Sequence, residues 1–323
     1  MQNTTHYNQR LNINELNNTA NLEDAIKNAE HLYISNLLGD EELLSSINFY
    51  LKKYNKKLWL SLNKSTEINQ ENLKQLRYLT NVKKLKIIVF NGFIEDLSEL
   101  SHINDLEEFT IYDNVKKGIS LAPLAKFKNL SFLSLYTGLT IKQYAVLNTF
   151  EKLEHLSARE IDFSKLNNLP IKELTANSKL IHSDLIAEKF PDIEYISLQN
   201  CKDVHIENIA SLPQLSDVRL RYIPHITRLT SFKNKENIFH FECVHLKNLE
   251  NIEALFELKQ LKYLMITDLE KLKAEDFYRL EELPNLKVAY ITFKSAKEND
   301  KFITFANAHN WIYKQPSLAK TTL

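Results

Sequence analysis

The 323-residue chain contains few glycines and no long apolar run. Its four glycines, at positions 39, 92, 118 and 138, lie too far apart for the glycine-rich loops that bring a backbone close to phosphate. Such loops are typical of nucleotide-dependent enzymes, so the sequence argues against that chemistry. A transmembrane helix needs roughly 18 or more apolar residues in succession, and no such stretch occurs.

The chain also lacks a charge surplus, with 41 Lys and Arg against 41 Asp and Glu. Nucleic-acid-binding proteins usually carry a basic surplus. The charges are nevertheless unevenly distributed: residues 52–86 hold ten basic and two acidic side chains, and residues 87–113 hold seven acidic and no Lys or Arg. We expect the two blocks to compensate each other, with Lys84 beside Glu108 on neighbouring strands. The alternative is a nucleic-acid binder or an enzyme that acts through residues 52–86.

A repeated apolar motif is present along most of the chain. Residues 193–201 read Ile-Glu-Tyr-Ile-Ser-Leu-Gln-Asn-Cys, which is apolar-x-x-apolar-x-apolar-x-x-Cys. Related copies recur at intervals of about 18 to 27 residues, which is the period of strand-and-return repeats. Their first positions are Val82, Leu106, Leu130, Leu153, Ile171, Ile193, Leu215, Ile238, Leu261 and Leu286, with looser copies starting at Ala29 and Asn55.

This pattern resembles the leucine-rich-repeat family over roughly residues 29–294, and its mixed spacing is similar to bacterial internalin-type and irregular repeats. The resemblance implies a right-handed α/β solenoid, or horseshoe, of about twelve repeats. Its parallel sheet would form the concave face, with helical or 3₁₀ segments on the convex side. We expect residues 1–28 to form an N-terminal cap and residues 295–323 a C-terminal cap. The latter would contain a helix over 296–307 that buries Phe302, Ile303 and Ala306.

The chain contains only two cysteines, Cys201 and Cys243. On the repeat register both point inward, two repeats apart, which is about 10 Å at a strand spacing of about 4.8 Å. A disulfide needs Cα atoms within about 7 Å, so both thiols are expected to be reduced. The first 30 residues show no signal-peptide core, and we therefore expect a cytoplasmic protein. The Asn-, Lys- and Ile-rich composition suggests a bacterial source.

Alternate strand residues should face the concave surface. The fifth position of the motif carries five successive small hydroxyls, from Thr110 to Ser197, which predict a shallow trough. Aromatic and arginine side chains, which are enriched in binding hot spots, surround it. Alternatively, Ser and Thr simply suit an exposed parallel sheet. We predict that the partner-binding residues are Tyr112, Phe132, Tyr136, His155, Arg159, Tyr195, Arg219 and Arg221.

Lateral neighbours on this face are expected to neutralise one another. The expected pairs are Asp217 with His240, Arg219 with Glu242, and His155 with Glu173.

Motifs for catalysis or metal binding are missing. Cys243 should point inward while His240 and Glu242 point outward, so the three do not share a tetrahedral metal. No H-E-x-x-H or G-x-S-x-G motif occurs, and no cofactor is expected. The resemblance implies a non-catalytic scaffold whose concave face binds another protein. A toxin-neutralising immunity protein and a host-directed effector are both open, and the partner's identity is not encoded.

Overall fold

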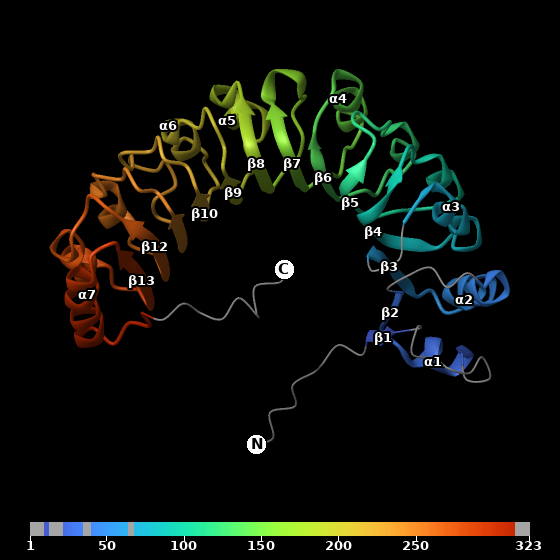
Figure 1. The fold of residues 1–323 in the computed structure, drawn as a ribbon, viewed down its shortest axis with the longest axis horizontal. Coiled ribbons are helices and arrows are strands. Elements are labelled where there is room, and N and C mark those ends of the chain that lie inside the picture. The colour runs from blue at the N-terminus through green and yellow to red at the C-terminus, as the bar shows by residue number, and fades with distance from the viewer. Residues whose placement is uncertain (1–9, 13–21, 35–39, 64–67, 314–323) are drawn as a thin grey trace. The chain divides into compact units, whose positions relative to one another are not determined.

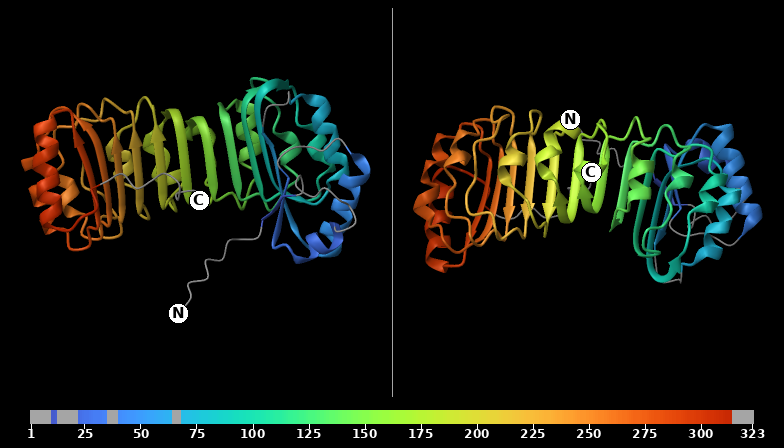
Figure 2. Two further views of the ribbon diagram at one scale, coloured as in Figure 1. Left: turned by 60° about the horizontal axis from the view of Figure 1, so that its bottom comes forward. Right: turned by 90° about the horizontal axis from the view of Figure 1, so that it is seen from above.

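The computed structural model describes residues 10–12, 22–34, 40–63 and 68–313. The chain divides into two compact units, residues 1–158 and 159–323. In each unit, the strands form one layer and the helices and 3₁₀ segments lie on one side of it (Figure 1). Figure 2 shows the strands of each unit running side by side.

Among the described residues of unit 1, strands β1 to β6 are parallel and pair in chain order, and the unit ends within β7. The elements are β1 (Arg10–Asn12), α1 (Leu22–Asn28), β2 (His31–Ile34), α2 (Glu41–Lys53), β3 (Lys57–Asn63), α3 (Gln70–Leu73), η3 (Lys74–Tyr78), β4 (Val82–Ile94), η4 (Ser98–His102), β5 (Glu108–Val115), η5 (Ala122–Leu124), β6 (Phe132–Gly138), α4 (Ile141–Leu147) and β7 (His155–Asp162).

Unit 2 repeats this plan with a second run of parallel strands, β8 to β13, also paired in chain order. The elements are η6 (Phe163–Lys165), β8 (Glu173–Ile181), η7 (Ser183–Leu185), α5 (Ile186–Lys189), β9 (Tyr195–Gln199), α6 (Ile206–Ala210), β10 (Asp217–Arg221), β11 (His240–Val244), η8 (Glu253–Glu257), β12 (Tyr263–Leu269), η9 (Ala274–Glu282), β13 (Val288–Phe293) and α7 (Ala296–Ala308).

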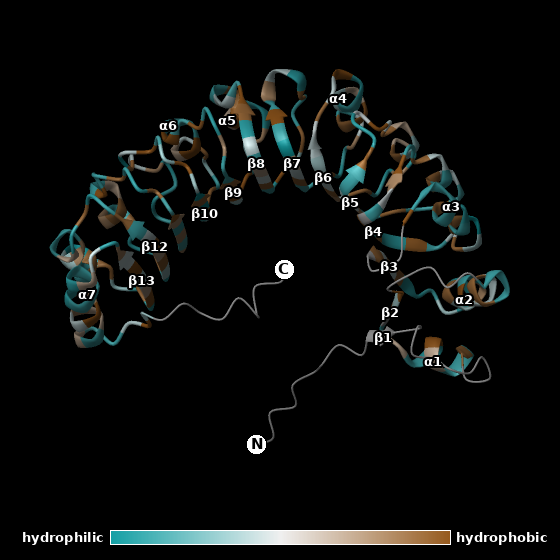
Figure 3. Ribbon diagram, viewed as in Figure 1, coloured by the Kyte–Doolittle hydropathy of each residue, from teal (hydrophilic) through white to brown (hydrophobic). Residues whose placement is uncertain are grey.

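The strands form where the motif alternates apolar and polar residues. In β9, Ile196 and Leu198 are buried, while the alternating residues Tyr195, Ser197 and Gln199 are half-exposed. Leu198 lies in register with Ala176 on one side and Leu220 on the other, so the inward positions of successive repeats stack into one core per unit. Apolar and polar residues are accordingly mixed along the strands (Figure 3).

The return segments begin with local caps. The Asp40 side chain accepts a hydrogen bond from the backbone N–H of Leu43, 3.0 Å away, which satisfies a free donor at the start of α2. Leu44, Ile47 and Leu51 then recur at helical spacing and are buried against the strands. Several later return segments, beginning with η4 and η5, consist of 3₁₀ turns.

The predicted strand register holds for β8 to β11 and departs from expectation most clearly between β3 and β4. The repeat motif places Lys57 beside Lys84, but in the structure Trp59 is the neighbour of Lys84. Trp59 and Lys57 are two residues apart, so the side chain beside Lys84 stays on its predicted face, and the pairing itself slips by one residue between Leu58 and Trp59. The β4 strand also runs beyond the motif to Ile94, through Gly92, whose φ of 95° favours glycine.

The chain ends agree in part with expectation. Helix α7 matches the predicted range and buries Phe302 and Ala306, but Ile303 is exposed, which corrects its predicted burial. Near the end of the described residues, a parallel bridge joins Ile312 to Val288. The assignment of residues 1–28 and 295–323 as caps remains a prediction.

Both cysteines are unpaired and buried, as expected from their inward positions. Among the described residues, no helix combines the length and apolarity needed to span a bilayer.

Candidate functional site

The side chains of the strands that turn away from the core form what we call the outward face. All eight predicted partner-binding residues lie on it. Tyr112 comes from β5, Phe132 and Tyr136 from β6, and His155 from the part of β7 in unit 1; Arg159 is in the part of β7 in unit 2, Tyr195 in β9, and Arg219 and Arg221 in β10. Neighbouring strands therefore bring Tyr112, Phe132, Tyr136 and His155 together in unit 1. In unit 2 they bring Tyr195, Arg219 and Arg221 together, and Arg159 belongs to neither group.

In unit 1, four residues form an aromatic cluster, comprising Tyr112, Phe132, Tyr136 and His155. The rings of Tyr112 and Tyr136 meet edge to face with centroids 5.5 Å apart. Phe132 and His155 stack with centroids 4.0 Å apart. Such aromatic pairs contribute roughly 0.5–1.5 kcal/mol beyond the area they bury. Tyr136 remains 44% exposed, so this cluster presents a supported aromatic ring to solvent.

The predicted trough of hydroxyls is not open in unit 1. The Tyr112 and Ser134 hydroxyls lie 2.8 Å apart, and Ser134 is only 1% exposed. Thr110 is buried as well. The prediction fails at these two positions, and at Ser134 the reason is that the larger Tyr112 side chain of the neighbouring strand reaches over it, whereas Ser157 remains half-exposed.

In unit 2, a charged cluster covers neighbouring strands of the outward face. It comprises Tyr195 from β9, Asp217, Arg219 and Arg221 from β10, His240 and Glu242 from β11, and Tyr263 from β12. Strand register places Asp217 between Tyr195 and His240, and it places His240 beside Tyr263. The cluster is therefore a direct product of parallel pairing.

Ion pairs in the charged cluster differ from those expected. Arg219 was expected to pair with Glu242, but it donates from Nε and Nη2 to the two carboxylate oxygens of Asp217, each at 3.0 Å. Residues two apart on a strand share a face, which allows this bidentate geometry. Arg221 instead donates from Nε to Glu242, at 2.7 Å.

Aromatic rings enclose these charges. The Arg219 guanidinium lies 5.0 Å from the ring centre of Tyr195, a cation–π geometry. The His240 ring stacks on Tyr263 at 4.3 Å. The His240 Nδ1 atom is 3.8 Å from Asp217, and its Nε2 atom is buried 3.8 Å from Glu242, beyond hydrogen-bond distance. The expected neighbourhood of Asp217 and His240 is thus confirmed, without a hydrogen bond.

Burial and charge set the protonation of this cluster. Burial alone would raise the pKa of Glu242, but His240, Arg221 and Arg219 outweigh it and lower that pKa to about 2. Burial raises the pKa values of Tyr195 and Tyr263, so both phenols stay neutral near pH 7. Glu242 is consequently a fixed carboxylate, poorly suited to proton transfer near neutral pH.

Asp217, His240, Glu242 and Tyr263 were not among the predicted site residues. Their outward positions and lateral neighbours were readable from the repeat register. The register did not show that these residues form one cluster, because the cluster depends on which nearby carboxylate each arginine pairs with. Burial raises the pKa of the Cys243 thiol well above its usual value, in agreement with its inward position. Within the described ranges, no group of His, Cys, Asp and Glu is arranged to hold a metal ion.

The basic block of residues 52–86 is compensated as expected. Lys84 pairs with Glu108, and its ammonium also lies 4.2 Å from the Trp59 ring centre. Lys57 pairs with Glu107 at 2.9 Å, and Lys83 pairs with Asp105. The Lys83 and Lys84 pairs join neighbouring repeats, the Lys57 pair spans the repeat between its partners, and together they remove much of the apparent basic patch.

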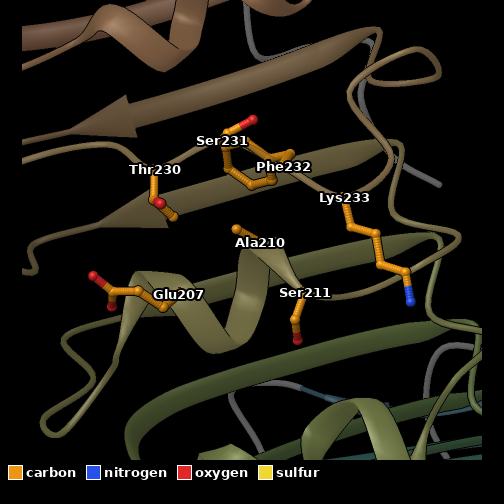
Figure 4. Close-up of a pocket in the computed structure, with 7 residues that line it drawn as sticks. All are labelled: Glu207, Ala210, Ser211, Thr230, Ser231, Phe232 and Lys233. Carbon is orange, nitrogen blue, oxygen red and sulfur yellow. The ribbon is translucent and has the colours of Figure 1, made fainter.

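An open pocket of about 370 Å³ lies on the return segments of unit 2, between α6 and residues 230–233 (Figure 4). It forms where the repeat joining β10 to β11, described throughout, contains no helix. Glu207 and Lys233 lie at opposite ends of the pocket and are exposed. None of the polar side chains that line the pocket is buried, so none is fixed in position to orient a ligand. The pocket contains none of the predicted binding residues.

No known family model matches the sequence. Similar solved structures include a leucine-rich-repeat protein from Leptospira interrogans, with 15% identity and a TM-score of 0.43, covering 90% of this chain and 91% of that one. An internalin from Listeria monocytogenes has 16% identity and a TM-score of 0.40, with coverage of 86% and 79%. Neither similarity identifies a partner or an activity. The recurring motif, the parallel pairing in each unit and the helical return segments show that the chain has a leucine-rich-repeat fold.

Proposed function

We propose that this protein is a non-catalytic scaffold that binds another protein through its outward face. The observation that carries the proposal is Tyr136, a large aromatic residue that is 44% exposed while its ring packs against Tyr112. Exposed aromatic side chains held rigidly by neighbours are the usual anchors of protein interfaces. Little side-chain freedom remains to be lost when such a ring is covered by a partner.

Unit 2 supports the same proposal with different chemistry. Its arginines are oriented by buried carboxylates and by Tyr195, so the charged cluster is preorganised. Arginine and tyrosine are enriched in hot spots, and charged pairs add specificity and speed of association. Glu242 and Asp217 are engaged in ion pairs, which favours a binding role over acid–base catalysis.

Two finer roles follow from the expected bacterial, cytoplasmic setting. One is neutralisation of a toxin by an immunity protein, and the other is recognition of a host protein by an effector. They differ in one observable: an immunity protein protects its own cell when the partner is produced there. If a strain that lacks this protein is no longer protected from the partner, the protein is an immunity protein. If the strain is still protected, the effector role is favoured.

The proposal is tested by purifying the partner from the native cell and measuring its affinity for outward-face variants. Tyr136→Ala and Arg159→Ala should weaken binding at least tenfold, which corresponds to about 1.4 kcal/mol. The melting curve of Arg159→Ala should be nearly unchanged, and Tyr136→Ala should lose no more stability than the roughly 0.5–1.5 kcal/mol of its ring contact with Tyr112. Both side chains are exposed, so truncation leaves the core intact.

The matched control is Lys128→Ala, on an exposed lysine of a return segment. Lys126 is not a suitable control, because its ammonium donates to the carbonyls of Ser101 and Ile103. If Lys128→Ala abolishes binding while Tyr136→Ala and Arg159→Ala do not, the partner binds elsewhere and the proposal fails.

A further inference from the structure

Arg221 offers a partly unused guanidinium on the outward face of unit 2. Its Nε atom donates to Glu242, and within the described residues its two terminal amino groups have no hydrogen bond. Arg219 differs, because its Nε and Nη2 atoms are both taken by Asp217. Arg221 therefore has an edge with two parallel donors available, the geometry that matches a carboxylate.

The charges of the cluster are arranged so that a partner meets this guanidinium first. The Arg221 side chain is 32% exposed, whereas the side chains of Glu242 and Asp217 are 6% and 12% exposed. The buried carboxylates neutralise the arginines but lie beneath them. An approaching protein thus encounters positive charge, even though these four side chains sum to zero.

Glu242 also fixes where the free edge points. A short ion pair to a buried carboxylate holds the long Arg221 side chain, so little rotamer freedom is lost on binding. Strand register places Gln199 on one side of Arg221 and Val244 on the other, both half-exposed. Its two lateral neighbours are therefore uncharged, and neither competes with an anionic group for the free edge of the guanidinium.

We propose that Arg221 receives an Asp or Glu side chain of the partner protein, as a bidentate ion pair at the centre of the unit 2 interface. This inference rests on the proposed function and adds the chemistry of the partner at one position. A carboxylate fits better than a phosphate group, because a phosphate adds nearly two negative charges close to Asp217 and Glu242.

The test selects peptides from a phage-displayed library of random octapeptides on the immobilised full chain. Selected peptides are then synthesised, and their affinities are measured by fluorescence anisotropy. We expect them to be enriched in Asp and Glu, and each acidic residue required for binding should tolerate Gln or Asn poorly. Raising the salt concentration should weaken binding, because the pair is partly exposed.

Variants assign the effect to Arg221. Arg221→Gln alone leaves Glu242 buried without its cation, so the informative variant is Arg221→Gln combined with Glu242→Gln, which replaces the ion pair by an amide pair. This double variant should bind the peptides at least tenfold more weakly. Arg221→Lys, which keeps the charge but lacks the fork, should weaken binding by a smaller factor. The matched control is Arg228→Gln, on a return segment, whose side chain is 71% exposed.

The outcomes separate this inference from the proposed function. Peptides without acidic residues that lose binding in Tyr136→Ala or Arg159→Ala overturn the inference and leave the proposed function standing. Acidic peptides whose affinity is equal for the wild type and the double variant also overturn the inference. Peptides that are insensitive to every outward-face change count against both, and a selection that returns no peptide overturns the inference.

Discussion

The Tyr112 hydroxyl lies 2.8 Å from the Ser134 hydroxyl, within hydrogen-bond distance across two neighbouring strands. This contact places the Tyr112 ring over the small side chains of the sheet, and Tyr136 packs against its edge. Ser134 becomes buried as a result. The small Ser134 side chain therefore leaves room for the Tyr112 ring to pack over it. Tyr136 is the exposed ring of this cluster and is the one available to a partner.

Breaking that contact should have a measurable cost. Tyr112→Phe and Ser134→Ala should each lower the free energy of unfolding by about 1 kcal/mol, since each leaves the other hydroxyl without its partner. Urea denaturation of both variants and of the double variant gives their coupling, expected at about 0.5–1.5 kcal/mol. Tyr136→Phe is the control, expected within about 0.5 kcal/mol of wild type because its hydroxyl has no hydrogen bond among the described residues. Strictly additive single effects would contradict the contact.

The stacked core provides a second prediction. Leu198 is fully buried between Ala176 and Leu220, so Leu198→Ala should cost about 2–5 kcal/mol through lost apolar burial and the cavity left behind. Denaturant unfolding measures this loss. Glu194→Ala, at an exposed position just before β9, should change stability by less than about 0.5 kcal/mol. A loss below about 1 kcal/mol for Leu198→Ala would show that the inward register is wrong.

Much of this arrangement was predictable from the sequence, because a strand has a period of two and parallel repeats stack in register. These two facts place Arg221 beside Val244 and Tyr112 on the outward face without further information. The shift that brings Trp59 beside Lys84 was not predictable, since it depends on packing between two repeats. The sequence also did not show that Arg219 pairs with Asp217, because more than one carboxylate lies within reach of the Arg219 side chain.

The compensated basic block leads to a third prediction. Lys57, Lys83 and Lys84 each pair with an acidic side chain, so few of their charges remain for phosphate contacts. Fluorescence anisotropy with a labelled single-stranded DNA and with an RNA of the same length should show no submicromolar binding at about 0.15 M salt. Binding that is submicromolar and strongly salt-dependent would reinstate the nucleic-acid alternative for residues 52–86.

Glu242 gives a pH-dependent prediction. Its pKa is about 2 in the folded protein, against an ordinary value of 4.5, so the unfolded chain binds a proton at a pH where the folded protein does not. The ion pair therefore contributes its full stabilisation, at most about 3 kcal/mol, above pH 4.5, and it loses this contribution as the pH falls from 4.5 toward 2.

At pH 3.5 the expected loss is about 1 kcal/mol, because the unfolded carboxyl is then mostly protonated and the folded one is not. Urea unfolding at pH 7 and pH 3.5 measures it as the difference between wild type and Glu242→Gln, which removes the titrating group and leaves the other acids in place. Glu194→Gln, at an exposed site, should behave as wild type does. If wild type and Glu242→Gln lose the same stability between the two pH values, Glu242 is not held as a carboxylate by Arg221 and Arg219, and the preorganisation of the charged cluster is refuted.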